Sequence, residues 1–162
     1  GRQRLDGAAM NPLTIYQDTL NLASDAILAG DFLGFAAMID FPYLVHTSQA
    51  HLLVNTVDDL RPSFDAMSQG LKARGVTHYE RVARAADYSA RDRIEGWHHS
   101  HILIDGAHMS YPYAGHHCLV RRDQLWLFSE ARYDVIAATQ WPLTADDIFA
   151  HVEDQTPPQA MQ

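Results

Sequence analysis

The sequence of 162 residues contains a single cysteine, Cys118, so no disulfide can form within the chain. No apolar run approaches the ~20 residues of a membrane-spanning helix, and no secretory leader is recognisable, so we expect a cytoplasmic protein without a membrane partner. Basic residues are scarce, because 12 Lys and Arg stand against 20 Asp and Glu, for a net charge of −8. A nucleic-acid surface needs clustered Lys and Arg, and we therefore expect no nucleic-acid partner.

The composition, 47% hydrophobic and 20% charged, is typical of one globular domain with a substantial core. Residues 1–12 are polar and small and predict a flexible N-terminal arm. Residues 13–137 carry the patterned elements of the domain. Residues 138–162 predict a C-terminal extension with a short helix near 144–152 and a disordered tail.

Three helices are predicted in the first half of the chain from the spacing of apolar residues and from their capping residues. They cover 13–29, 32–39 and 58–75. Gly30 is a natural stop for the first helix, and Asp31 can cap the second. Between the second and third helices, two short β-rich runs at 43–47 and 51–56 predict a small hairpin.

The second half predicts four long antiparallel strands, one over 77–90 and three between Arg93 and Val135. The latter stretch holds six of the ten histidines and two of the three tryptophans. Asp105-Gly106 lies between apolar runs and predicts a two-residue hairpin turn, while a second turn falls within residues 121–124. Helices followed by antiparallel strands indicate an α+β domain, in which a strongly curved sheet would enclose a pocket against the helices.

This order of elements resembles the nuclear transport factor 2-like superfamily, which includes ketosteroid isomerases, scytalone dehydratase and SnoaL-like polyketide cyclases. The resemblance covers residues 13 to 137. It rests on the junction Ala29-Gly30-Asp31-Phe32, on the short strand YLVHTS before the third helix, and on the ending RRDQLWLFSEARYDV. It implies a cystatin-like α+β barrel, with a curved antiparallel sheet wrapped around three helices to form a cone-shaped pocket.

The resemblance also implies a small hydrophobic ligand, no cofactor, and a homodimer packed through the outer face of the sheet. The catalytic residues of the ketosteroid isomerases do not carry over. Ala23 stands at the spacing of their helical tyrosine, and the short strand offers His46 or Thr47 where they have an aspartate. Scytalone dehydratase uses histidines on neighbouring strands, and this chain has histidines on similar strands.

A two-residue turn at Asp105-Gly106 predicts which strand residues share a face, because side-chain direction alternates. It places His98 opposite Tyr113 and Ser100 opposite Tyr111. The face richer in large apolar groups is assigned to the pocket. Its polar members are His98, Ser100, Tyr111, Tyr113 and His117. A two-residue second turn adds Trp126, Phe128, Glu130 and Arg132 to this face. A three-residue turn would reverse that assignment, and a β-bulge would exchange the faces beyond it.

The candidate acid and base groups are His46, His98 and His117, with Tyr111 polarising a substrate oxygen. Residues expected to contact the substrate are Tyr16, Asp40, Ser100, Tyr113, Trp126, Phe128, Glu130 and Arg132. His46 and Asp40 are expected near the pocket mouth. Glu130 and Arg132 can instead form a structural ion pair, and each buried His or Tyr can instead be a hydrogen-bonded core residue.

The opposite face carries His99 and His101, with His108 diagonally across. Such a cluster suits a metal only with a further ligand, so we predict no metal site and read these histidines as part of a polar dimer surface. Three functions remain open from the sequence. They are a cofactor-free isomerase, dehydratase or cyclase acting on a hydrophobic hydroxylated or ring substrate, a non-catalytic ligand-binding or interaction domain, and a structural β-subunit-like partner of an oxygenase.

Overall fold

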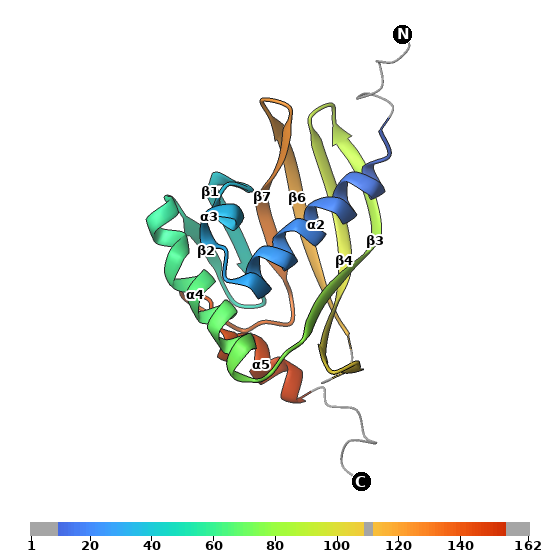
Figure 1. The fold of residues 1–162 in the computed structure, drawn as a ribbon. Helices are drawn as coiled ribbons and strands as arrows, with labels where there is room; N and C mark the ends of the chain where they lie inside the picture. The colour runs from blue at the N-terminus through green and yellow to red at the C-terminus, as the bar shows by residue number, and fades with distance from the viewer. Residues whose placement is uncertain (1–9, 109–111, 155–162) are drawn as a thin grey trace.

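The computed structural model describes residues 10–108 and 112–154, which form one curved sheet with helices on its concave side (Figure 1). The helices are α2 (Pro12–Ala29), α3 (Phe32–Ala36), α4 (Val57–Ala73) and α5 (Ala145–Asp154). The strands are β1 (Ile39–Thr47), β2 (His51–Val54), β3 (His78–Ala90), β4 (Arg93–Ile104), β5 (Ala107–His108), β6 (Tyr113–Arg122) and β7 (Leu125–Tyr133). The predicted α+β class is confirmed.

Local capping explains where the first helices begin and end. The Asn11 side chain accepts the amide of Leu13 at 2.8 Å, and Gly30 ends α2 with a left-handed φ of 72°. Asp31 caps α3 as expected, but α3 ends at Ala36, earlier than predicted. The reason is that the Met38 carbonyl accepts the amide of Phe128, which commits the next residues to the sheet.

The sheet has the strand order β2-β1-β7-β6-β4-β3, with β5 paired to β4. The long strands pair antiparallel as predicted, whereas β1 and β7 pair in parallel. Strand β1 begins at Ile39 and runs through Pro42, whereas the sequence predicted a strand only from residue 43. The β1–β7 register is interrupted between Ile39 and Leu44, and a proline is tolerated at such an irregularity.

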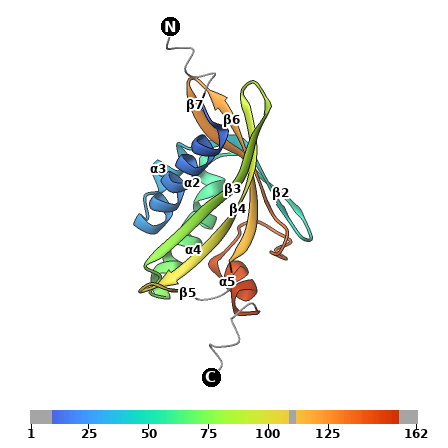
Figure 2. The same cartoon turned by 90° about the vertical axis from the view of Figure 1, so that its right-hand side faces the viewer.

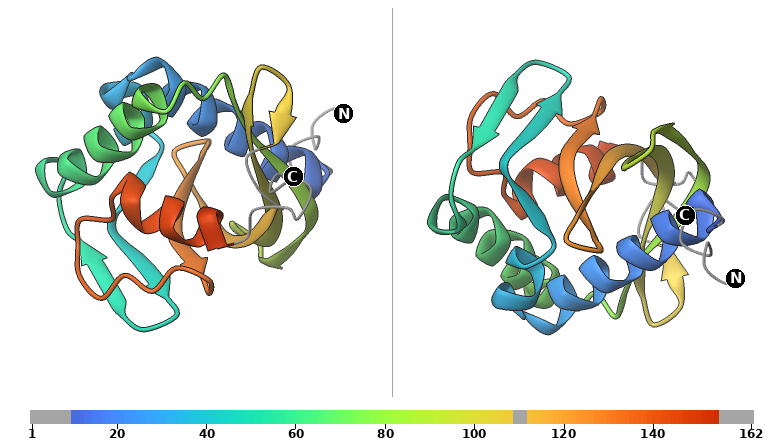
Figure 3. Two further views of the ribbon diagram at one scale, coloured as in Figure 1. Left: turned by 90° about the horizontal axis from the view of Figure 1, so that it is seen from below. Right: turned by 90° about the horizontal axis from the view of Figure 1, so that it is seen from above.

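Helix α2 crosses the concave face of the sheet, and α4 lies beside α3 on the same side (Figures 1 and 2). Helix α5 lies across one end of the curved sheet and packs on α4 (Figure 3, left). The segment after residue 137 shares the main core through Leu143, Ile148 and Phe149. Trp141 joins this segment to α4 by donating its indole N–H to the Asp59 carbonyl at 2.7 Å. This end of the sheet is therefore closed by the chain's own C-terminal part.

The turn at Asp105-Gly106 forms with positive φ at both residues, 48° and 84°. The short β5 pairs with β4 in the predicted register, but β6 pairs two residues further along, with Ser100 opposite Tyr113. A shift by two keeps the same side chains on the same face. The faces predicted for β4 and β6 are therefore confirmed although the register between them was wrong.

Strand β7 changes face along its length because it contains a bulge. The β6–β7 turn has two residues with positive φ, Asp123 and Gln124, and it places Phe128 opposite Leu119 on the concave face. The register then shifts, so that Glu130 pairs with Cys118 and Ser129 is the extra residue. Beyond this bulge the concave face receives Ala131 and Tyr133, while Glu130 and Arg132 point outward.

Candidate ligand-binding cavity

A cavity of about 90 Å³ lies between the concave face of the sheet and helices α2, α4 and α5. We call it the central cavity. Its wall is mainly apolar, with side chains such as Ile27, Val45 and Phe64. The larger polar side chains of the wall are Tyr43, Tyr79, Arg81, Tyr113, His117 and Tyr133. Apolar walls with a few convergent polar groups are what a small-molecule site requires.

His117 stands at the centre of this polar group. Its ring stacks on His98, with centroids 5.2 Å apart and planes at 11°, and lies 4.7 Å from the Phe128 ring. Its Nε2 is 3.4 Å from the Tyr133 hydroxyl and 3.5 Å from Nη1 of Arg81, and no described residue partners its buried Nδ1. Burial, helped by the Arg81 charge, lowers the pKa of His117 to about 3. The imidazole is therefore neutral at physiological pH.

Arg81 brings a charge into this apolar surrounding. Only 5% of the residue is exposed. Its Nε donates to the Ser24 hydroxyl at 2.9 Å and its guanidinium lies 5.2 Å from the Tyr79 ring centre, but Nη2 has no hydrogen-bond partner among the described residues. Burial works to lower the pKa of Arg81, but the surrounding tyrosines, Tyr79 first, raise it overall, so the guanidinium stays protonated. Burying such an ion costs several kcal/mol unless a partner offsets it.

Helix α2 fixes the strand that carries Arg81. The Gln17 amide donates to the Arg81 carbonyl and accepts the Ala83 amide, both at 2.8 Å. These two bonds replace ladder bonds that the edge strand β3 would otherwise leave open. Residue 81 is thus held by the helix and by its pairing with Ser100 on β4.

Three tyrosines of the wall, Tyr43, Tyr113 and Tyr133, are neutral at physiological pH. Burial raises the pKa of Tyr43, Tyr113 and Tyr133 above the usual value, and the Arg81 charge opposes this only in part. No Asp or Glu is among the described residues that line the central cavity. The wall therefore carries one positive charge and no negative charge.

Tyr16 and His98 form a buried pair behind the wall, although both were predicted to serve in the pocket. The Tyr16 hydroxyl and Nδ1 of His98 are 2.9 Å apart, and both residues are 0% exposed. Burial, followed by the effect of His117, lowers the pKa of His98 far below its usual range. Ser100 lies in the same buried layer, opposite Tyr113. Of the predicted pocket residues, Tyr113, His117 and Phe128 line the central cavity.

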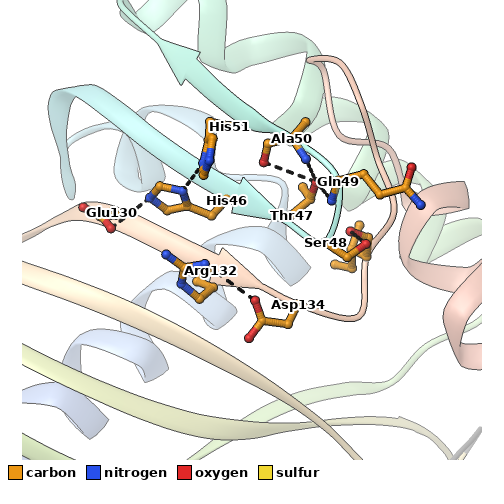
Figure 4. Close-up of polar contacts among 10 residues, drawn as sticks. His46, Thr47, Ser48, Gln49, Ala50, His51, Glu130, Arg132 and Asp134 are labelled. Carbon is orange, nitrogen blue, oxygen red and sulfur yellow. Dashed lines mark hydrogen bonds and ion pairs between the residues drawn. The ribbon is translucent and has the colours of Figure 1, made fainter.

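His46, Glu130 and Arg132 were predicted at the pocket, and this placement is wrong. Tyr43 and Val45 of β1 face the cavity, so alternation turns His46 to the outer face, and the bulge at Ser129 turns the other two outward. There His46 Nε2 lies 3.0 Å from a Glu130 oxygen, while its Nδ1 meets His51 (Figure 4). The alternative of an ion pair between Glu130 and Arg132 does not form, because Glu130 contacts His46 and Arg132 Nη1 lies 3.7 Å from Oδ1 of Asp134.

Two further predicted contacts lie away from the central cavity, and one lies outside the described residues. The Asp40 carboxylate pairs with Arg122 at 3.3 Å, near the β6–β7 turn. The Trp126 ring packs with Tyr88 at 6.1 Å and lies under the Arg121 guanidinium at 5.8 Å, and it is not on the cavity wall. Tyr111 falls in the segment 109–111, outside the described residues.

The histidines on the outer face form small pairs. His101 Nδ1 lies 3.2 Å from His108 Nε2, and His99 packs edge-on against Trp97 at 5.2 Å. Burial and the neighbouring His108 lower the pKa of His101. Within residues 10–108 and 112–154, no group of three His, Cys, Asp or Glu side chains is placed to hold a metal ion.

Sequence reasoning missed Tyr43, Tyr79, Arg81 and Tyr133. Tyr79 and Arg81 lie two apart in the strand predicted over 77–90, whose faces were left unassigned. An arginine two residues after Tyr79, and therefore on the same face of the strand, was the available signal. Separately, none of the described helices is long and apolar enough to cross a membrane.

Comparison with known proteins gives a fold and no closer relationship. No protein-family model matches the sequence, and a search of curated proteins finds no match. A function-unknown protein from Mycobacterium tuberculosis aligns over 96% of this chain and 99% of its own, with TM-score 0.59 and 15% identity. An NTF2-like protein with a cystatin-like fold from Novosphingobium aromaticivorans aligns over 82% and 90%, with TM-score 0.57 and 13% identity.

An NTF-2-like protein of unknown function from Shewanella oneidensis aligns over 75% of this chain and 98% of its own, with TM-score 0.57 and 8% identity. At these identities the likeness concerns the course of the backbone, and it confirms the fold that the sequence resemblance implied. The chain has the nuclear transport factor 2-like, cystatin-like α+β fold.

Proposed function

We propose that this protein binds a small, largely apolar molecule bearing an oxygen function in the central cavity and catalyses cofactor-free proton transfer on it. Isomerisation, dehydration and cyclisation are reactions of this kind. The observation that carries the proposal is the convergence on His117 Nε2 of the Tyr133 hydroxyl at 3.4 Å and the Arg81 Nη1 at 3.5 Å. A base and hydrogen-bond donors that meet in one water-poor site are the minimum for such chemistry.

In the proposed reaction, His117 takes a proton from a ligand carbon and returns it to a second carbon or to a leaving hydroxyl. The Tyr133 and Tyr113 hydroxyls lie on the same wall and would donate to the ligand oxygen as it gains negative charge. The cavity volume limits the size of the ligand. An engineered cavity of about 150 Å³ holds benzene, so about 90 Å³ suits a smaller molecule, of about four or five non-hydrogen atoms.

Non-catalytic ligand binding is the second candidate, and one observation favours it. A histidine whose pKa is lowered to about 3 is a weak base, whereas an effective base has a pKa near the working pH. Under this alternative His117 and the tyrosines only hydrogen-bond the ligand.

Hydrogen exchange separates the two candidates. Small hydroxy ketones would be incubated with the protein in D₂O, and ¹H NMR would report both line broadening on binding and loss of C–H signals on exchange. The proposal expects exchange that His117→Asn abolishes, while His116→Asn, a change on the opposite face of β6, leaves it intact. Binding without exchange would establish the non-catalytic alternative, and absence of both would reject hydroxy ketones as ligands and substrates of this cavity.

We also propose that two chains pair through the outer face of the sheet. On this face the half-buried Trp97 of β4 stacks on His116 of β6, with ring centres 6.3 Å apart. Aromatic groups with polar neighbours are typical of protein interfaces.

A further inference from the structure

We infer that the ligand of the central cavity is a short carboxylate anion held by the guanidinium of Arg81. This inference rests on the proposed function, since it names the class of molecule that the same cavity binds. It adds an anchoring residue that the sequence did not single out, and it assigns a charge to the ligand.

The guanidinium offers one edge to a ligand. Its Nε is used by the Ser24 hydroxyl at 2.9 Å, and its Nη1 makes a long contact of 3.5 Å with His117 Nε2. Nη2 is buried and has no hydrogen-bond partner among the described residues. Buried donors are almost always satisfied in folded proteins, so the edge formed by Nη1 and Nη2 is where an acceptor is missing. A carboxylate matches two parallel N–H groups of this edge.

The protein does not supply the counter-charge from the described residues. Arg81 lies within 4.0 Å of no carboxylate there. Its neighbour Glu80 is exposed, because side chains alternate along β3. Glu130 pairs with His46 on the outer face, and Asp40 pairs with Arg122. His117, Tyr43, Tyr113 and Tyr133 are neutral. A ligand anion is therefore the partner that the buried cation lacks.

The apolar part of the wall determines the chemical character of the rest of the ligand. Beyond Arg81, His117 and the tyrosines, the wall consists mainly of aliphatic and aromatic side chains from α2, α4, β1 and the C-terminal segment. Inorganic phosphate or sulfate would leave most of its oxygens against this apolar surface without hydrogen bonds, which is unfavourable. A carboxylate with a short apolar chain satisfies both parts of the wall, and propionate has about the size that the cavity admits.

Propionate and its neutral isostere propionamide provide the test. Binding to the wild-type protein would be followed by chemical-shift perturbation in ¹H–¹⁵N spectra at low ionic strength, with sodium phosphate as a third probe. We expect propionate to bind at least about tenfold more tightly than propionamide, because a charge-assisted bidentate pair is lost in the amide. We expect Arg81→Met to remove this preference, and Arg84→Met, at an exposed position of the same strand, to keep it.

The outcomes separate this inference from the function on which it rests. Equal binding of propionate and propionamide would overturn the anion assignment and leave cavity binding standing. Binding of phosphate in preference to propionate would overturn the carboxylate assignment, and binding of none of the three would count against the proposed function itself. Replacement of a buried charge by an apolar group is often tolerated, but if Arg81→Met does not fold, the wild-type comparison of the two isosteres still decides.

Discussion

The ring of His98 on β4 occupies the space where a side chain at Gly115 on β6 would begin. The two residues are paired across the strands, and a Cβ at position 115 would lie 2.9 Å from Nε2 of His98 and 3.1 Å from Cε1 of Tyr133. The His98 ring cannot move into solvent because it is fully buried, and the half-buried Tyr133 ring packs against His117. The glycine therefore makes room for the buried aromatic layer behind the central cavity.

Replacing Gly115 with alanine should lower the free energy of unfolding by about 1–3 kcal/mol, the usual cost of overpacking a closed core. Urea unfolding of Gly115→Ala against the wild type measures this. The double variant Gly115→Ala/His98→Ala should lose less free energy of unfolding than the sum of the losses in the two single variants. The reason is that the contact between the alanine Cβ and the His98 ring is absent in the double variant. Additive costs would show that the glycine is needed for another reason.

Stability should fall as the pH drops below about 6.5. The folded-state pKa of His117 is lowered to about 3 and that of His98 is also lowered, so the unfolded chain takes up protons first. The contribution of these neutral buried histidines to stability is fully present at a pH above their pKa in the unfolded chain. It is lost as the pH falls towards their pKa in the folded protein. Each histidine contributes a slope of about 1.4 kcal/mol per pH unit. Urea unfolding between pH 5 and 7.5 should show the slope reduced by about this amount in His117→Asn. In Phe128→Leu, which removes no proton site, the slope should be unchanged.

Trp141→Ala should both destabilise the protein and admit larger ligands. The variant loses the hydrogen bond to the Asp59 carbonyl and part of the cavity wall, at a cost of about 1–3 kcal/mol. Thermal unfolding with benzoate should show a larger stabilising shift in this variant than in the wild type, because the end of the cavity is opened. Trp126→Ala removes a tryptophan that is not on the wall, and it should leave the benzoate response unchanged.

The proposed pairing of two chains predicts a concentration-dependent dimer. Trp97→Arg introduces a charge on the outer face of the sheet and should give a monomer in sedimentation velocity experiments. Leu125→Arg, at a residue 62% exposed beside the β6–β7 turn, should remain dimeric. A wild-type protein that sediments as a monomer at 100 µM would rule the proposal out.

Local sequence signals were sufficient for most of the fold. The capping residues Asn11, Asp31 and Thr56 and the turn at Asp105-Gly106 act over a few positions, and the elements around them could be predicted from alternation and helical spacing. The extent of β1 could not, because Pro42 suggests an end of structure and only its pairing partner β7 shows that the strand continues.

The site was predicted only in part, because it depends on which face each residue joins. His117 and Tyr113 were placed correctly, since an even shift in register does not change the face. His46 was misplaced because the sequence gave no register between β1 and its parallel partner. Arg81 was missed because the faces of β3 were left unassigned, and Tyr133 was missed because the bulge at Ser129 exchanges the faces of β7 beyond it.

The extra residue at Ser129 also determines the electrical character of the interior. If β7 continued the regular pairing that it shows at Phe128, position 130 would lie opposite His117, and the Glu130 carboxylate would point toward Arg81. The Glu130 carboxylate and the Arg81 guanidinium would then form a buried ion pair within the chain. Loss of the bulge with every residue of β7 retained would therefore place a carboxylate beside Arg81. Deletion of Ser129 itself would close the bulge and leave Glu130 opposite Cys118 on the outer face.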